Sequence, residues 1–427
     1  MRLSQPVSAP EPSARPPRAH RRLLGALRHR NYRLFFTGQV ISTVGTWMQS
    51  IAQPWLVLQL THSGLWVGLV LAAQFTPVLV AGPVGGLVAD RFPKRRVLLV
   101  TQTLFMVPAF VLFLISYTQT AQVWMVFASA LAWGTIQLFD VPARQAFVIE
   151  MVGREDLTNA IALNSSVFNG AAVIGPSVAG VLIAAIGVPA CFLINSFSFL
   201  AAIGALALMR NLPVLVPGER LPAFQRVKEG AAYAVRDPLI GPMLLVVAVF
   251  SLFAMNRLTL IPLFAEQVLN VGAAGFGFLM AAIGLGAVSG ALTVATFERS
   301  ADGNRQFWVA LAWGAALILF SFSRAFWLSA LLLFVAGFCQ ISFLAVANSR
   351  IQTTAPDTLR GRVMALYAQA LLGVGPIGST QAGALASWLG APWAMAIGAT
   401  MAGLTVVAVR LLRPAVFTRP ARPETEL

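Results

Sequence analysis

The stretch GLVADRFPKRRVLL, residues 86–99, places four basic residues and one aspartate between two long apolar runs. The run before it covers roughly residues 66–88 and the run after it roughly 97–115. A run of about 20 apolar residues is long enough to cross the hydrocarbon core of a bilayer as a helix. The charged stretch therefore predicts a short loop at one membrane surface that joins two membrane-spanning helices.

The composition extends this pattern to the whole chain. Of its 427 residues, 58% are hydrophobic and only 11% are charged, whereas a soluble domain usually has about 25% charged residues. We therefore predict an all-α polytopic membrane protein with twelve transmembrane helices. The expected spans are roughly 35–58, 66–88, 97–115, 123–141, 158–186, 188–208, 239–264, 273–297, 307–322, 326–347, 363–389 and 391–412.

The sequence repeats itself weakly at a distance of about 200 residues. Gly175-Pro176 recurs as Gly375-Pro376, and VGREDL at 152–157 corresponds to APDTL at 355–359. Such a repeat indicates two pseudo-symmetric six-helix halves, a design of secondary transporters that place the substrate site between the halves. The predicted division is a basic N-terminal arm (1–33), an N-terminal half (34–208), a linker (209–238), a C-terminal half (239–412) and a tail (413–427).

The basic residues gather on one side of the predicted membrane. The N-terminal arm, the loop after the second span, the linker and the tail contain nearly all of them, and Arg324 is the exception among the other loops. Cytoplasmic loops carry such an excess of Lys and Arg, so both termini are expected in the cytoplasm. This distribution explains the net charge of +15. We predict no nucleic-acid partner, because the chain has no soluble domain that would bind one.

Five polar residues in the first span share one helical face. Gln39, Ser42, Thr46, Gln49 and Gln53 are spaced three or four residues apart, and an unpaired amide facing lipid costs roughly 2–7 kcal/mol. The stripe must therefore face water or other helices. We favour the wall of a central substrate cavity, while hydrogen bonding between helices remains the alternative.

Other polar residues lie inside the predicted spans, and intramembrane ionisable groups often mark ion or substrate pathways. Asp140 and Arg144 are one helical turn apart and are candidates for proton coupling, although mutual neutralisation explains them equally well. Arg257 faces the cavity or extends to the outer interface. Further candidate substrate-cavity residues are Asn164, Asn169, Asn256, Arg257 and Gln369.

The fifth span contains the stretch AAVIGPSVAG, residues 171–180. Proline cannot donate to the carbonyl four residues back and permits a bend. The small residues around Gly175, Pro176 and Gly180 predict a surface where a neighbouring helix approaches closely, and the eleventh span repeats the pattern at Gly375, Ser379 and Gly383. A static kink needed only for packing is the alternative.

The opening stretch resembles the signature loop of the major facilitator superfamily, a glycine followed by Asp-Arg and a basic cluster. The matching positions are Gly86, Asp90, Arg91, Lys94 and Arg95, while Pro93 stands where the family pattern has a second glycine. The resemblance implies the fold of that superfamily and a cytoplasmic gate at this loop. It also implies that Gly175, Pro176 and Gly180 form the fifth-span motif of antiporting exporters.

Several runs are similar to the drug-efflux branch of the superfamily, which includes macrolide and enterobactin exporters. They are PWLVLQLTHSGLWVG at 54–68, DVPARQAF at 140–147, NAIALNSSVFN at 159–169 and FGFLMAAIGLGAVSGAL at 276–292. Many members of this branch have an acidic residue at the position of Thr46, so their proton carrier does not transfer to this chain.

The expected protein is a monomeric bacterial inner-membrane exporter of drugs, macrolides or siderophores that works by proton antiport and contributes to multidrug resistance. An importer or facilitator of the same fold, a lipid flippase and a non-transporting scaffold remain alternatives. We expect that the protein is not an enzyme and that it binds no cofactor and no metal. The chain has neither a phosphate-binding G-x-x-x-x-G-K-[ST] loop nor a metal-binding histidine pair.

Overall fold

The computed structural model describes residues 25–153, 155–210, 231–297 and 302–418, and these residues form helices and no strands. The predicted arm, linker and tail fall largely outside these ranges, so their boundaries stay predictions. The N-terminal half contains α1 (Arg30–Thr61), α2 (Gly64–Arg91), α3 (Lys94–Tyr117), α4 (Val123–Val152), α5 (Leu157–Ile186) and α6 (Val188–Ala207), after a short turn at Gly25–Arg28.

The C-terminal half contains α8 (Ile240–Phe253), α9 (Arg257–Leu263), a π-helical turn (Phe264–Val268), α10 (Gly272–Phe297), α11 (Gly303–Phe322), α12 (Phe326–Thr354), α13 (Asp357–Ala368), a second π-helical turn (Gln369–Gly373), α14 (Gly375–Leu389) and α15 (Ala391–Leu412), with α16 (Ala415–Thr418) at its end. Eleven segments of the described chain are long and apolar enough to cross a membrane. The 32-residue α1 completes the twelve, since its polar stripe lowers its hydropathy but not its length. The predicted all-α fold is confirmed.

The seventh span is interrupted, which the sequence did not predict. We expected one helix over 239–264, but α8 ends at Phe253 and α9 begins at Arg257. Asn256 at the break bonds back to the carbonyl of Leu252 over 2.8 Å. The break supplies a non-helical backbone inside the membrane region, which proteins tolerate where it lies against other protein or a water-filled space.

The eleventh span contains a related irregularity. The predicted helix 363–389 consists of α13 and α14 joined by the π-helical turn Gln369–Gly373. Single π-helical turns inside helices occur frequently at functional sites. The Gly375-Pro376 pair stands at the start of α14, where proline needs no helical donor.

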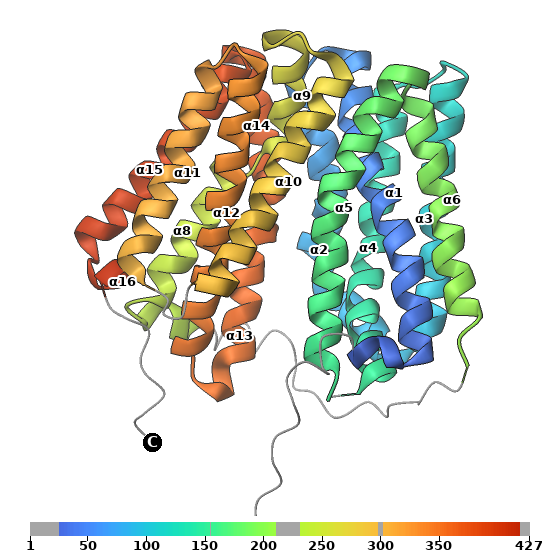
Figure 1. Ribbon diagram of the computed structural model, residues 1–427, viewed down its shortest axis with the longest axis horizontal. Helices are drawn as coiled ribbons and strands as arrows, with labels where there is room; N and C mark the ends of the chain where they lie inside the picture. Colours follow the sequence, from blue (N-terminus) through green and yellow to red (C-terminus); the bar gives the residue numbers. More distant parts are fainter. Residues whose placement is uncertain (1–24, 154, 211–230, 298–301, 419–427) are drawn as a thin grey trace, which may run out of the picture.

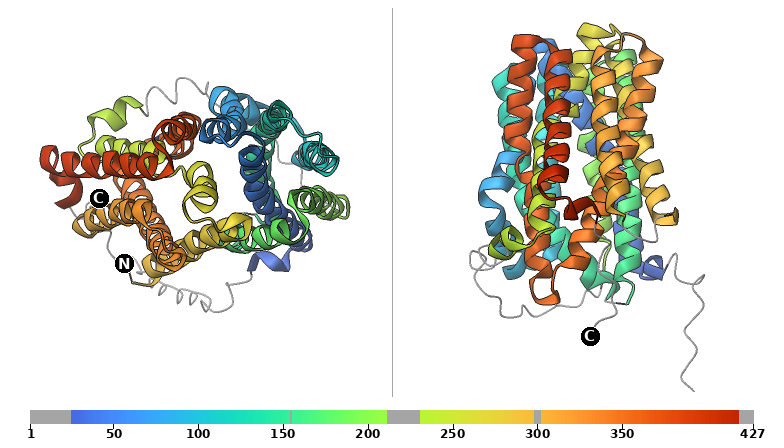
Figure 2. Two further views of the ribbon diagram at one scale, coloured as in Figure 1. Left: turned by 90° about the horizontal axis from the view of Figure 1, so that it is seen from above. Right: turned by 90° about the vertical axis from the view of Figure 1, so that its left-hand side faces the viewer.

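Each half is a bundle of helices. In the N-terminal half, α1 packs on α5 and α6, and α2 packs on α4. In the C-terminal half, α10 and α11 pack on α12. Two helix pairs connect the halves: α5 lies against α10, and α2 lies against α14. Figure 1 shows the two bundles side by side, and Figure 2 shows α9 near the centre of the ring of helices seen from above. Helix α9 contacts α1 and α2 of the N-terminal half.

Two ends of the molecule are used below as reference points. The basic end holds Arg91, where α2 ends, and Lys94, where α3 begins. The opposite end holds Thr61, where α1 ends, and Gly64, where α2 begins. In Figure 1 the bundles lie close together at the opposite end, beside α9, and diverge toward the basic end, beside α13.

Candidate functional site

The contact between α5 and α10 depends on small residues near the opposite end. A Cβ atom built on Gly180 would lie 2.9 Å from the Cα atom of Gly277 and 3.0 Å from the carbonyl oxygen of Ala273. A Cβ atom on Gly277 would lie 2.5 Å from the carbonyl oxygen of Pro176. These distances leave no room for a side chain, so the two backbones are in direct contact.

The contact between α2 and α14 has the same construction. A Cβ atom on Gly68 would collide with the carbonyl oxygen of Ser379, and one on Gly383 would collide with the carbonyl oxygen of Gly64. Each of these positions lies about 200 residues from a position of the first contact. We call the two contacts the paired seams: Pro176 and Gly180 against Ala273 and Gly277, and Ser379 and Gly383 against Gly64 and Gly68.

The same helices lose contact with the other half toward the basic end. Cβ atoms built on Gly82 and Gly86 of α2, on Gly170 of α5 and on Gly361 of α13 would meet nothing within 4 Å. The halves therefore touch along their sections near the opposite end and are separated near the basic end. The region between the halves is therefore open toward the basic end and closed at the opposite end.

The predicted motif residues of α5 serve two different neighbours. Gly175 faces α1 within its own half, where a Cβ atom would lie 2.5 Å from that of Trp47, while Pro176 and Gly180 belong to a paired seam. In α14, Ser379 and Gly383 match this role, but Gly375 does not, because a Cβ atom there would meet nothing within 4 Å.

Asp140 is the centre of a buried polar cluster in the N-terminal half and is 1% exposed. Its Oδ1 atom accepts a hydrogen bond from Thr101 Oγ1 over 2.7 Å and one from Gln102 Nε2 over 2.8 Å. Its Oδ2 atom accepts from Arg144 Nε over 2.9 Å and also from Arg144 Nη2. Arg144 Nη1 donates to Gln39 Oε1. The cluster joins α1, α3 and α4 and satisfies the buried carboxylate.

The polar stripe of α1 lies inside the N-terminal half in this conformation, and its role as the wall of a substrate cavity stays a prediction. Gln39, Ser42, Gln49 and Gln53 are each at most 8% exposed. Gln49 Oε1 accepts from Asn195 Nδ2 of α6 over 2.6 Å, and its Nε2 donates to Gln53 Oε1 over 3.4 Å. The half-buried Thr46 donates to the carbonyl of Ser42 over 2.9 Å. Of the stripe residues, Gln39 and Gln49 bond to other helices, whereas Thr46 and Gln53 bond within α1.

The polar residues of α5 differ in their surroundings. Asn164 Oδ1 accepts from Tyr32 Oη over 3.2 Å, and the same hydroxyl donates to the carbonyl of Ala160 over 2.9 Å. Asn169 is half-buried. In the other half, Gln369 is exposed in the π-helical turn. Any contact of Asn164, Asn169 and Gln369 with a substrate stays a prediction.

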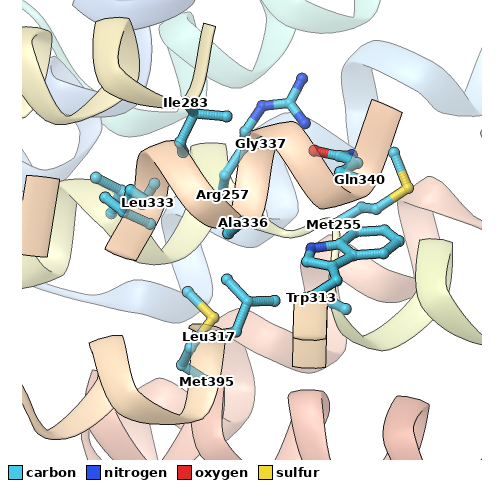
Figure 3. Close-up of a pocket in the computed structure, with 12 residues that line it drawn as sticks. Met255, Arg257, Ile283, Trp313, Leu317, Leu333, Ala336, Gly337, Gln340 and Met395 are labelled. Carbon is cyan, nitrogen blue, oxygen red and sulfur yellow. The ribbon is translucent and has the colours of Figure 1, made fainter. Parts of the chain in front are cut away.

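Arg257 lies at the break of the seventh span, at the rim of a small cavity of about 20 Å³. Gln340 of α12 and Trp313 of α11 line the same cavity. Figure 3 shows the guanidinium beside the Gln340 side chain and directed away from Leu317 and Met395. Asn256 is 8% exposed and bonds within its own helix region. Arg257 thus borders this small cavity of the C-terminal half, and its contact with a substrate stays a prediction.

The signature loop fastens helices within the N-terminal half. Lys94 Nζ lies 3.3 Å from Glu150 Oε1 of α4. Arg95 donates from Nε to the carbonyl of Leu206 over 2.8 Å and from Nη2 to the carbonyl of Ala207 over 2.9 Å. A cation at the last carbonyls of α6 also compensates the negative end of the helix dipole.

The signature loop also includes Gly86, Asp90 and Arg91. A Cβ atom on Gly86 would meet nothing within 4 Å, and the close helix contact belongs to Gly85, whose Cβ would collide with the carbonyl oxygen of Leu138. Arg91 is exposed. Asp90 is the second-last residue of α2, and its side chain lies outside the described part of the chain.

Sequence reasoning missed Thr101, Gln102, Asn195 and Gln340, which are all at most 6% exposed. Each is a polar residue within an apolar span, the same signal that identified Gln39 and Asp140. Thr101, Gln102 and Gln340 escaped attention because each stands without a polar partner three or four residues away in its own span, whereas the signal of Asn195, which has Ser198 three residues on, was overlooked.

Comparison with known proteins agrees with this architecture. Residues 23–421 match the family model described as transmembrane secretion effector. The chain is 27% identical to the multidrug efflux pump Tap of Mycolicibacterium fortuitum over 86% of this chain and 92% of that protein. It is 28% identical to the enterobactin exporter EntS of Shigella boydii serotype 18 over 92% of this chain and 94% of that protein.

Solved structures share the fold at low sequence identity. A transporter of the POT family in complex with a thioalcohol-conjugated peptide superposes with a TM-score of 0.73 at 11% identity, covering 91% of this chain and 96% of that one. A bacterial homologue of the human lysosomal transporter Spinster, in an inward-facing and unoccupied conformation, gives a TM-score of 0.67 at 14% identity, covering 93% and 96%. This chain belongs to the transmembrane secretion effector family of the major facilitator superfamily.

Proposed function

We propose that the protein exports small amphipathic molecules across the inner membrane by alternating access, with its basic end in the cytoplasm. The paired seams are the observation that carries this proposal. They close the opposite end while the same helices separate at the basic end, which leaves the region between the halves accessible from one side. The excess of Lys and Arg at the basic end assigns that side to the cytoplasm.

The pseudo-symmetry of the seams gives the transport cycle a simple geometry. Because each half contributes the same pair of surfaces, a rocking motion that opens both seams at the opposite end brings the basic ends of the same helices together. The cargo class follows from the relatives, which are named as a multidrug efflux pump and an enterobactin exporter. Drugs, macrolides and siderophores are therefore the compounds to screen.

Proton antiport is the driving force that we propose, with Asp140 as the proton acceptor. Its four hydrogen-bond donors come from α3 and from Arg144. A proton on this carboxylate would leave Arg144 a cation without a counter-charge and would loosen the connection of α4 to α1 through Gln39. A change of protonation would thus alter how three helices of one half are held together.

The test uses everted membrane vesicles from cells that overproduce the full chain. Uptake of labelled compounds from the drug, macrolide and siderophore classes is measured with and without a collapsed pH gradient. We expect gradient-dependent uptake of at least one class, and loss of its gradient dependence in Asp140→Asn. Uptake by no class would contradict export, and uptake that ignores the gradient would contradict proton antiport.

A further inference from the structure

We propose that the transported molecules carry an acidic group, and that Arg257, Gln340 and Trp313 form the subsite that binds it. This inference rests on the proposed export function and specifies its substrate class. The three residues come from the break of the seventh span, from α12 and from α11, and they line one cavity at the start of α9 (Figure 3).

Each of the three side chains offers a donor without a protein partner. Within the described chain, no hydrogen bond or ion pair is formed by the guanidinium of Arg257, the carboxamide of Gln340 or the indole N–H of Trp313. Gln340 is 6% exposed and Trp313 is 2% exposed. Arg257 is partly exposed, and no polar atom of the three residues is among the fully enclosed atoms of the described chain that lack a partner. Polar groups are normally hydrogen-bonded, so three donors that reach open space at one cavity indicate a site that an external acceptor completes.

The charge of the site is not compensated from within the protein. Among the described residues, the acidic residues inside the spanning segments are Asp140, Glu150 and Glu266, and Glu150 Oε1 lies 3.3 Å from Lys94 Nζ at the basic end. Asp140 is held by Arg144 in the other half, and Glu266 Oε1 lies 3.9 Å from His62 Nδ1. Arg257 is thus a cation at a cavity whose other lining side chains are apolar, apart from Gln340 and the indole N–H of Trp313. An anion removes the cost of keeping such a cation out of water.

The depth of Arg257 excludes a lipid headgroup as the natural acceptor. Eleven residues separate it from Val268 at the end of the spanning segment, which corresponds to about 16 Å along a helix. The cavity itself is about 20 Å³, enough for one water molecule or one oxygen-sized group. The acidic group would occupy this space, while the apolar body of the molecule extends into the region between the halves.

The break in the seventh span gives this subsite a link to the transport cycle. Helix α9, which begins at Arg257, contacts α1 and α2 of the other half near the opposite end. The Cδ1 atom of Leu263 in α9 lies only 2.9 Å from where a Cβ atom of Gly64 would be. A ligand bound at Arg257 therefore lies at the start of α9, the helix that contacts the N-terminal half near the opposite end.

The experiment compares two fluorescent probes that differ in one charge. Dansylglycine carries a carboxylate, and dansylglycinamide carries a neutral amide of nearly equal shape. Both are titrated onto the purified full chain in phosphatidylcholine nanodiscs. A charge-assisted hydrogen bond contributes about 1.5–3 kcal/mol, so we expect wild type to bind the carboxylate about tenfold more tightly than the amide.

Three variants test whether this subsite causes the preference for the carboxylate probe. Arg257→Gln should bind both probes equally, and Arg257→Lys should keep a preference for the carboxylate because it keeps the cation. Gln340→Leu should weaken dansylglycine about threefold, the loss of a single neutral donor, and leave dansylglycinamide unchanged. Arg324→Gln, at an exposed arginine near the end of α11, is the matched control and should behave as wild type. Size-exclusion chromatography checks that each variant is folded.

Equal binding of the two probes to wild type would overturn the proposal, and so would a carboxylate preference that survives in Arg257→Gln. If Arg257→Gln does not fold, an unchanged preference in Gln340→Leu would overturn it instead. Export of neutral compounds alone, with no charge preference, would remove this inference and leave the proposed function standing. A charge preference that depends on Arg257 in a chain that exports nothing would contradict the proposed function and leave the binding of an acidic group at this subsite standing.

Discussion

At the scale of single residues, Asp140 is a carboxylate buried inside the N-terminal half, where it needs hydrogen-bond donors and a counter-charge. It is 1% exposed and is held by Thr101, Gln102 and Arg144. A buried ion pair adds little net stability, but removal of one partner leaves the other as an uncompensated charge. The cluster therefore fixes how α3 and α4 meet more than it strengthens the fold.

Asp140→Ala should lower the free energy of unfolding by about 3 kcal/mol, because Arg144 then lacks its counter-charge. The double variant Asp140→Ala with Arg144→Ala should lose less. Thermal unfolding in detergent measures both, and Thr103→Val, at an exposed threonine of α3, is the control. A double variant that is less stable than Asp140→Ala would contradict this account of the cluster.

Sequence analysis at this scale identified polar faces but not their neighbours. The spacing of Gln39, Ser42 and Gln49 placed them correctly on one side of α1, since the helical period fixes which residues share a face. It contained no information on what packs there, and α6 and α4 supply Asn195 and Arg144. Likewise, one residue turns the helix by about 100°, which is why Gly85 rather than Gly86 contacts α4.

At the scale of helices, the paired seams are the contacts that hold the halves together. The seam residues of α5 could be predicted from the sequence, because Pro176 and Gly180 belong to a run of small residues in an apolar span. The break between Phe253 and Arg257 was not predictable in the same way, because FAMNR contains neither glycine nor proline. Only tertiary contacts decide that the helix stops there.

Gly180→Leu should reduce transport to less than a tenth of the wild-type rate, a loss of about 1.4 kcal/mol or more. Its side chain has no space against Gly277 and Ala273, so the seam cannot close. Gly170→Leu on the same helix is the matched control, because a Cβ atom there meets nothing within 4 Å, and it should keep most of the activity. Uptake into everted vesicles measures both variants, and equal rates would contradict the role of the seam.

At the scale of the whole molecule, the closed end depends on backbone contact rather than on charge. The nearest ion pair between the halves joins His62 and Glu266, with nitrogen and oxygen 3.9 Å apart and the His62 side chain 75% exposed. Exposed pairs of this kind contribute about 0–1 kcal/mol. The paired seams, by contrast, exclude any side chain at four glycine positions of two helix crossings, Gly180 and Gly277 in one and Gly68 and Gly383 in the other.

His62→Ala should therefore leave the transport rate within about twofold of wild type, since an exposed pair is worth so little. The variant is compared with Gly180→Leu in the same vesicles. A loss for His62→Ala as large as that for Gly180→Leu would show that the pair, and not the seam, closes this end.

The central claim is that the two ends of the molecule open and close in opposition. Spin labels at Ile186 and Gln267 report on the opposite end, and labels at Ile161 and Thr296 report on the basic end; all four are exposed. The labelled cysteines are introduced after replacement of the buried Cys191 and Cys339.

Double electron–electron resonance then compares wild type with Gly180→Leu. Because leucine forces the seam apart, the account predicts a longer distance between 186 and 267 together with a shorter distance between 161 and 296. A longer distance at the opposite end with no shortening at the basic end would contradict it.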